Sequence, residues 1–90
     1  MGSLIFHGHS CFEIQTDDKR VVIDPFLTGN PLADIGPGDL QAIDAVLLTH
    51  GHADHLGDGI DIAKNHDATV VAPYELAMFC QEKLLFPMLM

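Results

Sequence analysis

The sequence predicts a chain of the α+β or αβ class, in which antiparallel hairpin strands are followed by a βαβ unit and a terminal helix. Two observations support this order. Short runs of alternating apolar and polar residues open the chain, and two unbroken apolar runs later flank a segment of helical spacing. Ninety residues with 48% hydrophobic content can form one packed core, so we expect a single domain over 1–90, complete or part of a larger one.

Three strands are expected at the beginning of the chain, where β-branched and aromatic residues alternate with polar ones. Turn residues separate them: His-Gly-His-Ser after the first strand, and two aspartates with Lys19 and Arg20 after the second. The third strand ends before Pro25, because proline lacks the N–H that a sheet requires. The expected strands are Leu4–His7, Cys11–Thr16 and Val21–Ile23.

A long irregular region is expected from Phe26 to Ile43, where prolines and glycines form turn pairs and no period is visible. Irregular segments of this length are often functional. Because the region follows Asp24, we expect it to form a wall of the functional site. A plain connector is the alternative.

The second half of the chain predicts a parallel, right-handed βαβ unit. Asp44–Thr49 has no alternation, which is typical of a strand covered on both faces. Leu56–His66 has helical spacing, and Ala68–Ala72 is a second buried strand. A last helix is expected to begin at Pro73, since proline is favoured in a first turn, and to end at Pro87.

Four potential metal ligands, His50, His52, Asp54 and His55, directly follow the predicted strand Asp44–Thr49. Side chains alternate sides in extended backbone, so His50 and His52 can face one ion, and Asp54 continues the series. His55 breaks the alternation and requires a turn. Imidazole and carboxylate groups suit zinc, iron or manganese better than calcium. The alternative is a histidine-rich surface loop with no specific ligand.

Composition narrows the function classes. Thirteen acidic and four basic residues give a net charge of −9, which disfavours nucleic acids and anionic membranes as partners. No apolar run is long enough to span a membrane, and the beginning of the chain does not resemble a signal peptide, so we expect a soluble cytoplasmic protein. Cys11 and Cys80 are expected to be buried small residues and not a disulfide pair or nucleophiles.

Several motifs together resemble a known family. After an apolar strand, the pattern Thr49-His50-x-His52-x-Asp54-His55 resembles the signature of the metallo-β-lactamase superfamily. Further motifs occur in the family's order at His7–Ser10, Val22–Phe26, Gly29–Pro31 and Ala72–Ala77. Together they resemble the amino-terminal part of a bacterial and archaeal family of uncharacterised metal-dependent hydrolases, similar to L-ascorbate-6-phosphate lactonase. The resemblance extends to about Met78, and residues 79–90 form a divergent tail.

The resemblance implies a four-layer αβ/βα sandwich with a metal centre between two sheets. It implies that His50 and His52 bind one metal, and that Asp54 and His55 bind a second. The expected cofactor is a divalent transition metal, zinc first with manganese or iron as alternatives, up to two in a complete site. The expected reaction is attack of a metal-bound hydroxide on an ester, lactone or phosphodiester, with Asp54 as catalytic residue that orients the hydroxide or accepts its proton.

Two further residues are candidates for support of the metal ligands. Asp24 is expected to accept a hydrogen bond from a ligand imidazole, with a structural turn role as the alternative. His9 is expected either to approach the site or to be a satisfied structural histidine. His7 and His66 are expected at the surface.

A second function class competes with the hydrolase. Family members are more than twice as long, and their later ligands have no counterpart in this sequence. The competing expectation is a truncated, non-enzymatic fragment that binds metal weakly and forms a homo-oligomer through an uncovered sheet face. The hydrolase class implies a small-molecule substrate, whereas the fragment class implies another copy of the chain as partner.

Overall fold

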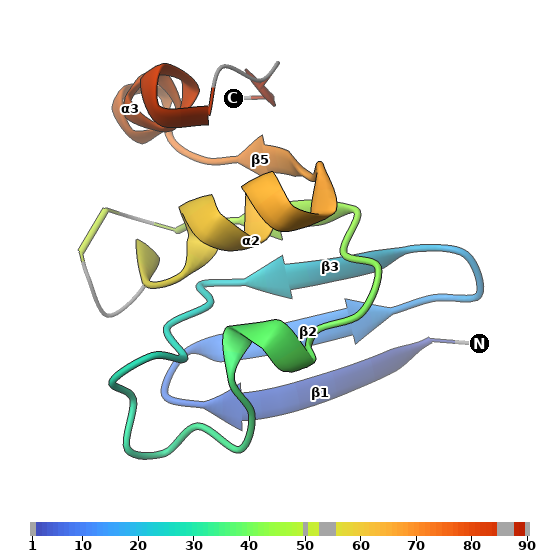
Figure 1. The fold of residues 1–90 in the computed structure, drawn as a ribbon. Coiled ribbons are helices and arrows are strands. Elements are labelled where there is room, and N and C mark those ends of the chain that lie inside the picture. Colours follow the sequence, from blue (N-terminus) through green and yellow to red (C-terminus); the bar gives the residue numbers. More distant parts are fainter. Residues whose placement is uncertain (1, 50, 53–55, 85–87, 90) are drawn as a thin grey trace.

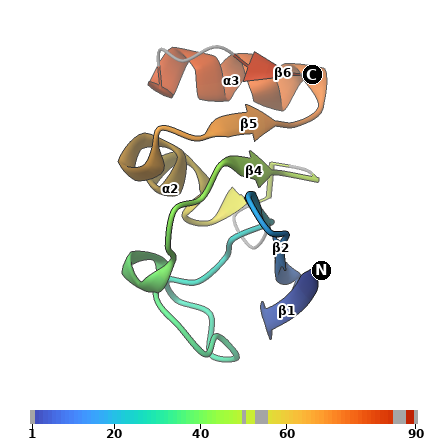
Figure 2. The same cartoon turned by 90° about the vertical axis from the view of Figure 1, so that its right-hand side faces the viewer.

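The computed structural model describes residues 2–49, 51–52, 56–84 and 88–89. Its strands form one mixed sheet in the order β1-β2-β3-β4-β5-β6 (Figures 1 and 2). The first three strands are antiparallel, and β3 to β6 are parallel. The strands are β1 (Ser3–Gly8), β2 (Cys11–Gln15), β3 (Arg20–Ile23), β4 (Ala45–Leu47), β5 (Thr69–Val71) and β6 (Met88–Leu89), and the helices are the 3₁₀ turn η1 (Pro37–Asp39), α2 (Gly59–His66) and α3 (Tyr74–Leu84).

The predicted hairpin strands and βαβ unit are confirmed. The helix α2 connects the parallel strands β4 and β5, as expected of a crossover connection. It begins at Gly59 and not at Leu56, and it ends at Asp67, which takes a left-handed conformation and donates its N–H to the carbonyls of Ala63 and Lys64. The strand β6 was not expected from the sequence. The predicted helix end at Pro87 lies outside the described residues.

The core lies on one face of the sheet. Val22, Val46 and Val70 are fully buried neighbours on β3, β4 and β5. Ile62 of α2 packs in the same cluster, and so does Leu40 from the connection between β3 and β4. Figure 2 shows α2 and η1 on the same side of the sheet. Along the described parts of the chain, no helix combines the length and hydrophobicity needed to cross a bilayer.

The opposite face of the sheet is apolar and partly exposed. Leu4 and Phe6 of β1 are 67% and 55% exposed. The neighbouring positions on β3 and β4, including Leu47, are half-buried, so the expectation that Asp44–Thr49 is covered on both faces is wrong. The side chains of this open face belong to Leu4, Phe6, Phe12, Ile14, Val21, Ile23, Ala45, Leu47, Thr69 and Val71, of which Thr69 alone is polar.

Candidate metal centre

The predicted ligands follow β4 at the carboxyl edge of the parallel strands, where sites of open α/β sheets lie. His52 is within the described residues and is exposed, and its carbonyl accepts a hydrogen bond of 2.8 Å from the N–H of Leu56. His50, Asp54 and His55 lie outside the described residues, so the grouping of the four ligands remains a prediction. Within the described ranges, which lack these three residues, no group of three or more His, Cys, Asp or Glu side chains is placed to hold a metal.

Asp24 anchors the beginning of this ligand loop, which we define as residues 50–56. The carboxylate is buried, and it accepts the Thr49 N–H at 2.7 Å and the Thr49 hydroxyl at 2.6 Å. The Asp24 N–H donates to the carbonyl of Leu47 at 2.8 Å. Hydrogen bonds to an ionised carboxylate are about twice as strong as neutral ones. Asp24 therefore fixes the backbone immediately before His50.

The contact between Asp24 and Thr49 is relevant to the two roles predicted for Asp24, a hydrogen bond from a ligand imidazole and a structural role in a turn. Its φ of +46° is a left-handed conformation that aspartate tolerates better than most residues, so the strand ends in a sharp turn at this position. The bonds to Thr49 give Asp24 a structural role. The expected hydrogen bond from a ligand imidazole remains a prediction.

Asp58 anchors the other side of the ligand loop. One oxygen of its carboxylate accepts the N–H groups of Leu27 at 3.2 Å and Thr28 at 2.8 Å. Its own N–H donates to the carbonyl of Pro25 at 2.9 Å. Residues 24–28 thus hold the chain both before and after the ligand loop. The position of Asp58 before a helix suggests a cap, but its side chain makes no cap hydrogen bond and binds this distant segment instead.

Gly57 allows the second anchor to form. A Cβ at this position would lie 2.5 Å from the Cα of Phe26 and 2.6 Å from the carbonyl oxygen of Pro25. Gly57 also has a φ of +45°, which side chains disfavour. The glycine is needed because two backbone segments meet here.

His9 lies beside the same segment. It occupies the turn between β1 and β2 with a φ of +57°, and its ring meets the ring of Phe26 edge-on at a centroid distance of 5.6 Å. This contact suits a structural histidine. A role for His9 in the site remains a prediction.

The expectation that His7 is a surface residue is wrong, whereas His66 is only partly at the surface. His7 is 5% exposed, and its two ring nitrogens contact carboxylates of Glu13 and Asp34. His66 is half-buried, and its Nδ1 accepts the N–H of Ile43 at 3.2 Å. In both cases the fold places backbone or carboxylate partners from distant segments around the ring, which a local pattern does not reveal.

The cysteines are inert, as expected. Cys11 and Cys80 are both fully buried and are not joined in a disulfide. Burial, reinforced by the negative charges of surrounding carboxylates, raises the pKa of Cys11 to about 12. Burial also raises the pKa of Cys80. Both thiols stay protonated at neutral pH, so neither is a ready nucleophile or metal ligand.

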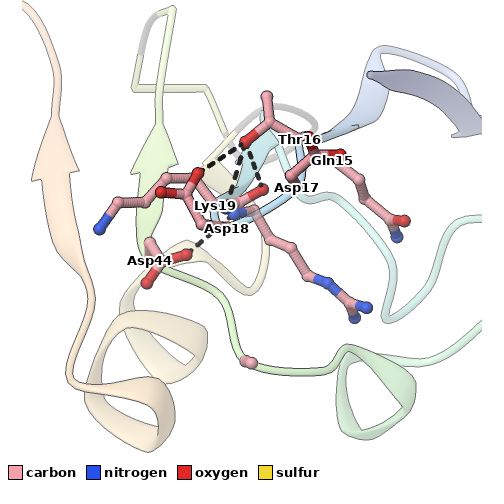
Figure 3. A pocket seen from close by; sticks show the side chains of 8 residues that line it. Gln15, Thr16, Asp17, Asp18, Lys19 and Asp44 are labelled. Atoms are coloured by element: carbon pink, nitrogen blue, oxygen red, sulfur yellow. Dashed lines mark hydrogen bonds between the residues drawn. The ribbon is translucent and has the colours of Figure 1, made fainter. Parts of the chain in front are cut away.

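Two hollows border the sheet at its opposite ends. One is apolar, holds about 500 Å³, and lies at the carboxyl ends of β3, β4 and β5, where Thr49 forms part of its lining. The other holds about 260 Å³ and is formed by the β2–β3 turn and Asp44 (Figure 3). Its groups already pair locally, since the Arg20 N–H donates to Asp44 at 2.8 Å. The apolar hollow is the one that includes Thr49, the residue before the ligand loop.

The chain is similar in sequence and fold to known metal-dependent proteins. The chain matches the family model of the metallo-beta-lactamase superfamily over residues 4–90. The UPF0173 metal-dependent hydrolase of Bacillus cytotoxicus is 58% identical over 74 residues, which are 82% of this chain and 32% of that protein. The metallo hydrolase Igni18 from the archaeon Ignicoccus hospitalis has a TM-score of 0.85 and 31% identity, covering 96% of this chain and 37% of its own. CmlA, a diiron β-hydroxylase from Streptomyces venezuelae, has a TM-score of 0.59 and 28% identity, covering 78% of this chain and 15% of its own.

A mixed sheet with antiparallel strands followed by parallel ones, and with η1 and α2 on one face, is a fold of the metallo-hydrolase type. The chain belongs to the metallo-beta-lactamase superfamily, and its fold is that of the amino-terminal half of this sandwich. The relatives are metal-dependent hydrolases by name. The chain spans about a third of the length of the curated relatives that it matches.

Replacement of Gly57 by alanine is expected to destabilise the protein. The added Cβ would clash with the backbone of Pro25 and Phe26 and would strain a positive φ. The free energy of unfolding, measured by urea titration, should fall by more than about 1 kcal/mol. Gly38→Ala is the matched control, because a Cβ at Gly38 meets nothing within 4 Å. Equal stability of the two variants would contradict the close approach at Gly57.

Proposed function

We propose that this chain supplies the metal-binding part of a metal-dependent hydrolase, with His50, His52, Asp54 and His55 as ligands. The observation that carries the proposal is the double anchoring of the ligand loop. Asp24 holds Thr49 on one side, and Asp58 holds residues 27 and 28 on the other. These carboxylates fix the backbone on both sides of the four proposed ligands, which supports a role for the segment between them. The names of the relatives support the same class.

The donor set fits a divalent transition metal. Three imidazoles and one carboxylate suit zinc, manganese or iron, and the two thiols are fully buried in the core. We propose zinc, with manganese and iron as alternatives. The similarity to CmlA, a diiron protein, keeps iron among them. When bound, such a metal acts as a Lewis acid that lowers the pKa of water and polarises the substrate.

In the proposed reaction, some residues of this chain would position the ligand loop, and Asp54 would accept a proton. Thr49, held by Asp24, sets the direction in which the backbone enters the ligand loop. Asp54 is the proposed proton acceptor for the attacking water. The proposed substrate is an ester, lactone or phosphodiester, and the lactone option follows the predicted similarity to L-ascorbate-6-phosphate lactonase. Since the chain spans about a third of its relatives, we propose metal binding for this chain and turnover for a full-length relative.

A metal-binding titration tests this proposal. Zinc or manganese should bind the purified chain, and His50→Ala with His52→Ala should weaken binding by more than about 100-fold, because both are proposed direct ligands. Isothermal titration calorimetry measures the affinity. His66→Gln is the matched control, since it removes a histidine of α2 that contacts Ile43. Equal affinities of the wild type and the double variant would contradict the ligand assignment.

A second candidate function, self-association, follows from the open face. Its exposed residues include Leu4, Phe6 and Ile14, and the face carries no charged side chain. Contiguous apolar patches of this kind mark interaction sites. The proposed occupant is the open face of a second copy, because an uncharged face avoids the repulsion that a net charge of −9 creates elsewhere.

Sedimentation velocity tests self-association. The wild type should sediment as a dimer or larger species at micromolar concentration, and Phe6→Glu should shift it to a monomer because a charge would be buried between the two faces. Leu32→Glu is the control, since Leu32 is also exposed, at 68%, but lies outside the open face. A monomeric wild type, or dissociation by Leu32→Glu to the same extent, would exclude this candidate.

A further inference from the structure

His7 occupies an irregular position at the end of β1. The register of β1 against β2 pairs Phe6 with Phe12 and then Gly8 with Cys11, so His7 is the extra residue of a bulge. Bulges redirect side chains. His7 is buried, and Glu13 of β2 is equally buried beside it.

Both ring nitrogens of His7 meet carboxylates. Nδ1 lies 2.8 Å from Oδ1 of Asp34, and Nε2 lies 3.0 Å from Oε1 of Glu13. A neutral imidazole has one N–H, so one nitrogen would present a lone pair to a carboxylate oxygen. The imidazolium form has two N–H groups and donates both. With both carboxylates ionised, the geometry therefore favours the protonated ring.

Asp34 belongs to the irregular connection between β3 and β4, so His7 joins this connection to the hairpin. The same segment touches the hairpin again, because the Asn30 side chain donates to the Gly8 carbonyl at 3.4 Å. A Cβ at Gly8 would clash with the carbonyl of Leu32. The side chain of Asp34 is 57% exposed, whereas that of Glu13 is 6% exposed. The bond to Asp34 is therefore the one that water can replace.

We propose that His7 is a proton-operated latch that holds residues 30–34 against the β1–β2 hairpin. Loss of the His7 proton releases the Asp34 contact and loosens this segment, while Glu13 keeps its hydrogen bond from Gln15 at 2.7 Å. The segment continues from residues 24–28, which anchor the ligand loop. The latch thus lets pH act on the support of the candidate site without titrating a ligand.

The charges around His7 determine whether the latch opens or closes as the pH rises. Burial alone would lower the pKa of His7, but the hydrogen bonds and negative charges of Glu13 and Asp34 outweigh it, and the pKa is raised above 6.5. Cys11, the other titratable group on β2 near these carboxylates, stays a neutral thiol. The state in which His7 contacts Asp34 binds the proton more tightly than the released state. The latch is therefore fully closed below pH 6.5, the ordinary pKa of histidine, and it opens as the pH rises through the raised pKa of His7.

Amide hydrogen exchange, measured by NMR on the full chain from about pH 5 to about pH 9, tests the latch. The reporters are the N–H groups of Leu32 and Ala33, which donate to Asn30. Corrected for intrinsic exchange, their protection should fall above pH 6.5 by at most about tenfold per pH unit, because one proton is released. The N–H of Ala68, which donates to Ala63 inside the βαβ unit, should keep its protection.

Two charge-removing variants complete the test. Asp34→Asn should move the midpoint of the fall toward pH 6.5, because one partner of the imidazolium becomes neutral. Asp67→Asn removes a charge at an exposed left-handed position that asparagine also tolerates, and it should leave the midpoint unchanged. The latch is overturned by pH-independent protection at Leu32 and Ala33, by an equal fall at Ala68, or by the same midpoint in all three proteins.

Discussion

The hydrogen bonds from Thr49 to the buried carboxylate of Asp24 are the constraint on which the candidate site depends. They join the ends of β3 and β4, two parallel neighbours, at the point where the chain leaves the sheet. A buried carboxylate requires such partners, because an unpaired charge in this position would be strongly destabilising. Two hydrogen bonds to Asp24 therefore hold Thr49, the residue before the ligand loop, at the end of the sheet.

The two faces of the sheet differ in their surroundings. One face packs α2 and the connection from β3 to β4 and supplies the core, while the open face leaves Leu4 and Phe6 in solvent. The chain spans about a third of the length of its curated relatives, and the open face is the surface that we propose for self-association. The proposed metal binding involves the edge of the sheet, whereas the proposed self-association involves this face, so mutations can test the two proposals separately.

Local sequence patterns predict the strands and helices of this chain. They do not predict contacts between residues that are far apart in the sequence. Alternation and unbroken apolar runs were sufficient for the hairpin strands and the βαβ unit. The partnership of Asp24 with Thr49 joins residues 25 positions apart, and that of Asp58 with Thr28 joins residues 30 apart, so no local period signals either. His7 is expected at the surface from the sequence, at the end of the first strand. The pairing of β1 with β2 places His7 beside Glu13, and the sequence of β1 alone does not specify this pairing.

The most direct test of the anchoring of the ligand loop is a double-mutant cycle of Asp24→Asn and Thr49→Val, measured as the zinc dissociation constant. If Asp24 acts through Thr49, each single variant should weaken binding, and the double variant should be no weaker than the worse single one. The coupling energy should then be about 1 to 3 kcal/mol. Additive losses would place the effect of Asp24 elsewhere, and unchanged affinity in all three variants would show that the ligand loop needs no anchor.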